Sequence, residues 1–67
     1  MLIKFHSYKT AEPVYINPYH VVIVTKGDNC TEVRMTGDIT LSIKQDFGTV
    51  ISKINEELDG EDRLHYM

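Results

Sequence analysis

With 67 residues, a formal net charge of −3 and one cysteine, this chain is expected to form a single domain near the lower size limit for independent folding. The lone Cys30 excludes an intramolecular disulfide, and no Cys/His spacing suggests zinc, so oligomerisation is the common stabilising device that remains. The acidic balance, with seven Lys and Arg scattered along the chain, argues against binding to a nucleic-acid polymer, which usually needs a basic patch.

The N-terminal part of the chain is typical of two short strands joined by a polar loop. Residues 2–6 place Ile3 and Phe5 on one face, and residues 13–17 alternate in the same way. The loop between them lacks the Asn-Gly or Gly-Gly pair that fixes a turn type. We therefore predict two strands and leave the geometry of their connection open.

Asn17-Pro18 interrupts this pattern, because proline cannot donate to a strand ladder and restricts the residue before it. A third strand is predicted at residues 20–26, and it contains four apolar residues in succession, 21–24. The turn residues that follow, "KGDN", end this strand.

The pairing of the third strand follows from the rule that directly opposite residues share a face of the sheet. A four-residue loop, 27–30, would pair Val24 with Val33 and Val22 with Met35. We therefore expect Val22 and Val24 in the core. The residues expected on the opposite face are Val21 and Ile23.

The fourth and fifth strands are predicted at residues 31–36 and 38–44. A two-residue turn would pair apolar Met35 with polar Thr40. A three-residue loop, or another odd length, pairs Met35 with Ile39 and keeps apolar residues on one face. We therefore predict the odd-length loop.

A helix is predicted at residues 46–58, where one apolar stripe recurs at helical spacing. Its stripe consists of Phe47, Val50, Ile51, Ile54 and Leu58. Asp46 is the expected N-cap and Gly60 the expected C-terminal glycine, and the tail, 59–67, is expected to fray. The predicted fold is α+β and mostly β, with a small antiparallel five-stranded twisted sheet or partly open barrel followed by one C-terminal amphipathic helix.

Residue patterns for catalysis or metal binding are weak. The three histidines, His6, His20 and His65, are not spaced as metal ligands and do not adjoin a nucleophile. No histidine or basic residue adjoins Cys30, and neither an EF-hand nor a phosphate-binding glycine loop is present. We therefore expect that the protein is not an enzyme and that it has no catalytic residue, no metal and no cofactor.

Two sets of residues are candidates for binding. The candidates for an oligomer interface, chosen for their apolar or aromatic character on the third strand and before it, are Val21, Ile23 and Tyr19. The candidates for binding an anionic ligand, which combine a polar cluster near the bend with donors on the polar sheet face, are Tyr15, Asn17, His20, Arg34, Thr40, Ser42 and Lys44. The alternative for the cluster near the bend is structural, with the tyrosines covering the core and Asn17 bonding its own turn.

No apolar run approaches the roughly 20 residues of a membrane span, and the N-terminus lacks the pattern of a signal peptide. A cytoplasmic protein is therefore expected.

The segments "PVYINPYHVVIV", "TEVRMTGDITLSI" and "VISKI" resemble the short bacterial FlbD (SwrD-type) flagellar and swarming-motility proteins. The resemblance covers about residues 2–58 and implies a compact β-rich domain with a non-enzymatic accessory role. The positions that match the family pattern are Asn17, Pro18, Val22, Val33, Gly37, Val50 and Ile54. The chain departs from the pattern in its first loop, which lacks a glycine turn, in its longer second loop and in its acidic tail.

The leading hypothesis is a non-enzymatic interaction module that works as a homo-oligomer, with an FlbD-like accessory function and another protein as a further candidate partner. The alternative is a phage-type inhibitor that sequesters a small anionic nucleotide signal between subunits. A small hydrolase using His20 or Cys30 is the third and least supported hypothesis. A flagellar or a bacteriophage genome context would distinguish the first two.

Overall fold

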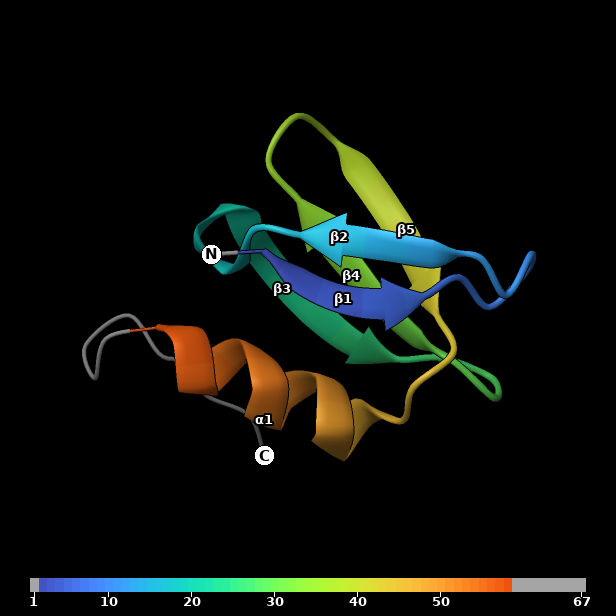
Figure 1. The fold of residues 1–67 in the computed structure, drawn as a ribbon. Helices are drawn as coiled ribbons and strands as arrows, with labels where there is room; N and C mark the ends of the chain where they lie inside the picture. The colour runs from blue at the N-terminus through green and yellow to red at the C-terminus, as the bar shows by residue number, and fades with distance from the viewer. Residues whose placement is uncertain (1, 59–67) are drawn as a thin grey trace.

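The computed structural model describes residues 2–58, which form five strands, a short 3-10 helix and one α-helix (Figure 1). The strands are β1 (Ile3–His6), β2 (Pro13–Ile16), β3 (Val21–Lys26), β4 (Thr31–Met35) and β5 (Ile39–Ile43). The helices are η1 (Pro18–His20) and α1 (Phe47–Glu57). The predicted tail, 59–67, with Gly60, lies outside the described residues.

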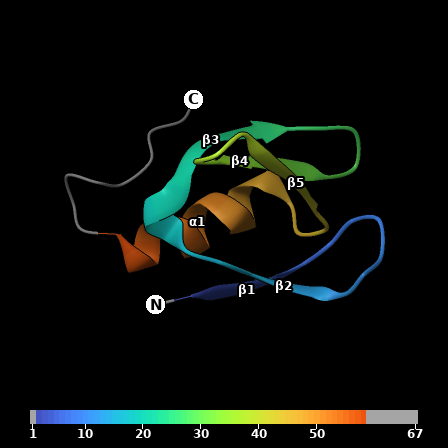
Figure 2. The same cartoon turned by 90° about the horizontal axis from the view of Figure 1, so that it is seen from above.

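The strands form two antiparallel sheets, a β1–β2 ribbon and a three-stranded sheet in the order β3-β4-β5. Of the two predicted arrangements, a five-stranded sheet or a partly open barrel, the single five-stranded sheet is therefore not observed. One isolated bridge, Ser7 to Ile43, joins them within the described chain. Seen from above, α1 lies between the ribbon and the three-stranded sheet (Figure 2). The mostly β fold with one C-terminal helix is therefore confirmed, and these residues form no closed barrel.

The separation of the two sheets has a physical reason in the core. Apolar side chains from the ribbon, the sheet and the helix meet in one cluster, so the ribbon turns away from β5 to face the helix. The buried members are Ile3, Phe5, Ile16, Val33, Ile43, Val50, Ile54 and Leu58. A flat five-stranded sheet would leave the apolar face of the ribbon without this shared core.

The β4–β5 hairpin confirms the predicted three-residue loop. Met35 lies opposite Ile39, and Val33 lies opposite Leu41. Gly37 has a φ of 84°, a conformation that glycine adopts without steric cost. The alternation of apolar and polar residues therefore predicted this register correctly.

The predicted pairing of β3 is right for Val24 and wrong for Val22. Val24 lies opposite Val33, but Val21 lies opposite Met35, because a β-bulge between Val21 and Ile23 inserts an extra residue. Val21 therefore packs against the core, whereas the side chain of Val22 is 53% exposed. The expected orientations of both valines are thus wrong.

The segment before β3 explains why the bulge is needed. Asn17 Oδ1 accepts a hydrogen bond from the Tyr19 backbone N–H at 3.0 Å, which starts η1. The carbonyl of His20, at the end of η1, accepts from the Thr36 backbone N–H at 2.9 Å. These bonds anchor the start of β3, and the bulge takes up the additional residue.

Helix α1 begins at its predicted N-cap. The Asp46 carboxylate accepts hydrogen bonds from the Thr49 backbone N–H at 3.3 Å and from the Thr49 hydroxyl at 2.7 Å. The predicted stripe faces inward, with Val50, Ile51 and Ile54 buried. In residues 2–58, no helix has the length and apolar character that a membrane crossing needs.

Candidate functional site

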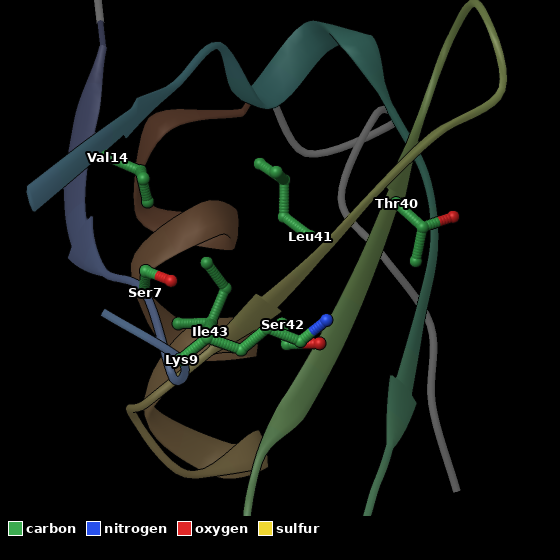
Figure 3. Close-up of a pocket in the computed structure, with 7 residues that line it drawn as sticks. All are labelled: Ser7, Lys9, Val14, Thr40, Leu41, Ser42 and Ile43. Atoms are coloured by element: carbon green, nitrogen blue, oxygen red, sulfur yellow. The ribbon is translucent and has the colours of Figure 1, made fainter. Parts of the chain in front are cut away.

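A cavity of about 170 Å³ lies between β5, β2 and the loop after β1. Its lining residues are Ser7, Lys9, Val14, Thr40, Leu41, Ser42 and Ile43. Figure 3 shows Leu41 and Ile43 extending from β5 into the space that Val14 also lines. The cavity is therefore lined by three aliphatic side chains, one lysine and three hydroxyl-bearing residues, of which Thr40 and Ser42 lie on the edge strand β5.

The loop that carries Lys9 is held close to β5 by main-chain hydrogen bonds. The Tyr8 N–H donates to the Ser42 carbonyl at 2.9 Å, and the Lys44 N–H donates to the His6 carbonyl at 2.8 Å. Beyond this contact the ribbon diverges from β5. The cavity occupies the place where the two sheets separate.

The same bonds show which backbone groups of β5 point away from β4. Because successive residues of a strand direct their N–H and C=O groups to opposite sides, Thr40 shares the outward direction of Ser42 and Lys44. No hydrogen bond to the Thr40 N–H, the Thr40 C=O or the Ser42 N–H is found within residues 2–58. The cavity therefore adjoins a short open strand edge.

A second cavity, of about 310 Å³, lies where the β3–β4 loop meets the start of α1. It is lined by Lys26, Gly27, Asn29, Cys30, Lys44, Asp46 and Phe47. The Thr49 hydroxyl and then the Thr49 backbone N–H lower the pKa of Asp46 below its ordinary value of 3.8. The carboxylate thus occupies the anion-binding end of the helix, which disfavours a second anion there.

The structure does not bring the seven predicted ligand-binding residues into one cavity. Thr40 and Ser42 line the first cavity, and Lys44 lines the second. Arg34 lies near the hairpin loop, where its guanidinium is 3.5 Å from the Asp38 carboxylate. The four candidates on the polar sheet face therefore do not share one pocket.

The remaining ligand candidates lie near the bend. Tyr15 is 61% exposed on β2, and Asn17 caps η1. His20 Nδ1 lies 3.4 Å from the Thr36 hydroxyl. The structural role considered for Asn17 is therefore observed.

Sequence reasoning missed Ser7, Lys9 and Val14, which complete the first cavity. Their local sequence pattern gave no signal. Ser7 and Lys9 lie in a loop whose conformation the sequence does not determine, and Val14 is an ordinary strand residue. They meet β5 only through the angle between the two sheets.

The predicted interface residues have different environments. Tyr19 is 53% exposed and Ile23 is 44% exposed, whereas Val21 packs inward. The bulge adds Val22 to the exposed group. We call Tyr19, Val22 and Ile23 the β3 apolar strip.

Within residues 2–58, no three His, Cys, Asp or Glu side chains gather as metal ligands would. The Nδ1 atom of His6 lies 3.0 Å from the side-chain nitrogen of Gln45. The side-chain oxygen of Gln45 accepts from the His6 backbone N–H at 3.1 Å. This histidine therefore takes part in a contact between the two sheets.

Comparisons with protein-family models, with curated proteins and with solved structures found no match. The resemblance to FlbD proteins therefore stays a prediction from the sequence segments quoted above.

Proposed function

We propose that the protein is a non-enzymatic interaction module that forms homo-oligomers through the β3 apolar strip. The observation that carries this proposal is the position of β3 at the edge of its sheet. Among the described strands, β3 pairs with β4 alone, and two neighbouring aliphatic side chains, Val22 and Ile23, are exposed there. An open apolar edge is a favourable site for strand pairing between copies.

The strip is large enough to contribute to association but not to dominate it. Fully burying a Val or Ile side chain contributes about 1.5–3 kcal/mol, and about half of each side chain is still exposed here. Covering Val22 and Ile23 in both copies of a twofold dimer therefore contributes about 4 kcal/mol. A micromolar dissociation constant needs about 8 kcal/mol, so Tyr19 and main-chain bonds would supply the rest.

Light scattering after size exclusion tests this proposal. We expect the parent protein to form a dimer or larger species at micromolar concentration and Ile23→Lys to shift it to monomer. Ile39→Lys is the matched control, because Ile39 is a comparably exposed isoleucine, 52% accessible, on β5, the opposite edge of the sheet. A monomeric parent, or equal effects of the two lysine variants, would contradict the proposal.

The proposed cellular role is that of a cytoplasmic accessory protein like the FlbD proteins. It is supported by the quoted sequence segments and by the exposed strip. A flagellar genome neighbourhood is the expected observation, and a cluster of small phage genes would instead favour the inhibitor hypothesis.

The nucleotide-sequestering alternative draws support from Thr40 and Ser42, which line the first cavity. The cavity of about 170 Å³ is smaller than the roughly 300 Å³ at which pockets for drug-sized ligands begin. A nucleotide would therefore need a site shared by two subunits. A thermal-shift screen with nucleotides and cyclic dinucleotides tests this, and unchanged melting temperatures would reject it for those ligands.

A further inference from the structure

We propose that the first cavity and the open edge of β5 form a docking groove for an extended peptide segment of a partner protein. The segment places one aliphatic side chain in the cavity and a carboxylate beside Lys9. This groove is separate from the β3 apolar strip, because β3 and β5 are opposite edges of the three-stranded sheet.

The volume of the cavity suits a single aliphatic side chain. Its volume of about 170 Å³ is close to that of an engineered apolar cavity of about 150 Å³ that binds benzene. Val14, Leu41 and Ile43 supply the apolar lining. Val14 and Leu41 are only half-buried, so an occupant would remove further apolar surface from water.

The open edge favours a peptide over a small molecule. Thr40 offers an outward N–H and C=O, and Ser42 offers an N–H, in the spacing of a strand ladder. An extended peptide satisfies all three groups when it adds a strand to a sheet edge. Its alternate side chains then point to the two faces, and one of them points toward Leu41.

The charge of the lining favours an acidic segment. Lys9 is the one ionisable group among the lining residues, and the other polar side chains there are hydroxyls. No ion pair of Lys9 is found within residues 2–58. A carboxylate at this rim therefore gains a cation partner without displacing another acid, although the whole chain carries a net charge of −3.

The probe is the synthetic peptide acetyl-Glu-Thr-Leu-Thr-Glu-amide, added to ¹⁵N-labelled full-length protein. Its symmetry places a glutamate two residues from the leucine in either strand direction, on the same face. We expect a dissociation constant of about 1 mM or tighter, with amide shifts at residues 7–9 and 40–43. Replacing leucine by alanine or both glutamates by lysine should weaken binding at least about fivefold.

Two protein variants test separate parts of the groove. Thr40→Pro removes an outward N–H, which an edge strand tolerates, and should weaken binding about tenfold. Thr40→Ala keeps that N–H and should weaken binding clearly less than Thr40→Pro. Lys9 is exposed, and Lys9→Glu should weaken binding of the glutamate-containing peptide about tenfold. The same variant should bind the lysine-containing peptide as the parent binds the glutamate-containing one. Because Lys9→Glu leaves β5 unchanged, it tests the groove even if Thr40→Pro does not fold.

Isovalerate distinguishes a peptide groove from a pocket for small acids, because it can fill the cavity and reach Lys9 but cannot pair with the strand edge. Equal binding of isovalerate and the peptide would overturn the proposal. So would the absence of amide shifts at about 5 mM peptide, or shifts centred on β3. Ile23→Lys should bind the peptide like the parent, so a failure of the homo-oligomer proposal leaves this test intact.

Discussion

Replacing Gln45 by leucine should destabilise the join between the two sheets. The side chain of Gln45 contacts both the backbone N–H of His6, at 3.1 Å, and the Nδ1 atom of its ring, at 3.0 Å. Leucine keeps a similar length but cannot form either hydrogen bond. The backbone carbonyl of residue 45 would still accept from the Thr31 hydroxyl at 2.9 Å.

The magnitude follows from what the substitution leaves without a partner. A buried donor that loses its acceptor costs about 1–3 kcal/mol, and water can reach part of the half-buried His6. We therefore expect the free energy of unfolding to fall by about 1–2 kcal/mol. For a domain of this size, that loss lowers the melting temperature by about 4–16 °C.

Urea denaturation followed by circular dichroism measures this loss. If the free energy of unfolding falls with urea concentration at the same slope as in the parent, the fold is unchanged. Gln45→Glu keeps an acceptor for the His6 N–H, so its free energy of unfolding should lie between those of the parent and Gln45→Leu. Adding His6→Ala to both the parent and Gln45→Leu isolates the ring contact. A stability of Gln45→Leu within about 0.3 kcal/mol of the parent would refute the argument, because it would mean that water replaces the glutamine at no cost.

Three further substitutions test other local features. Asp46→Asn keeps an N-cap but removes a carboxylate whose folded-state pKa is lowered by Thr49. The parent should therefore lose stability relative to Asp46→Asn as the pH falls through 3.8 and below, and thermal melts with the same pH dependence for both proteins would contradict this. Ala11→Gly should raise the free energy of unfolding by about 0.5–1 kcal/mol in urea denaturation, because Ala11 has a φ of 61°, and no gain would argue against strain there. Thr31→Val should cost about 1 kcal/mol in the same assay, since the buried hydroxyl that bonds the Gln45 carbonyl is lost, and a variant as stable as the parent would show that bond to be neutral.

The regular elements could be predicted because local pattern determines them. In the β4–β5 hairpin, polar and apolar residues alternate, so a shift by one residue would exchange core and solvent faces. The helix likewise has one apolar stripe and an N-cap, Asp46, that the sequence displays directly.

The bulge in β3 could not be predicted, because four consecutive apolar residues fit either phase of the strand equally well. What decides the phase is the hydrogen bond from Thr36 to the carbonyl of His20, which joins residues 16 positions apart and has no local signature. The interface prediction therefore included Val21, which packs inward, and missed Val22.

The first cavity and the Gln45 contact depend on the angle between the two sheets. Thr40 and Ser42 were singled out for their donors, but Lys9 joins them only where the ribbon leaves β5. Gln45 and His6 are 39 residues apart, a separation at which side-chain periodicity carries no information.

The narrow join between the sheets also predicts where the native protein opens first. Beyond its own hairpin bonds, the β1–β2 ribbon is hydrogen-bonded to the rest of the described chain through a few groups around Ser7, Ile43 and Gln45. Subglobal opening tends to follow such boundaries between cooperative units. Amide protons of the ribbon should therefore exchange with solvent before those of the three-stranded sheet, in a motion that transiently uncovers Phe5 and Ile16 while β3, β4 and β5 stay paired.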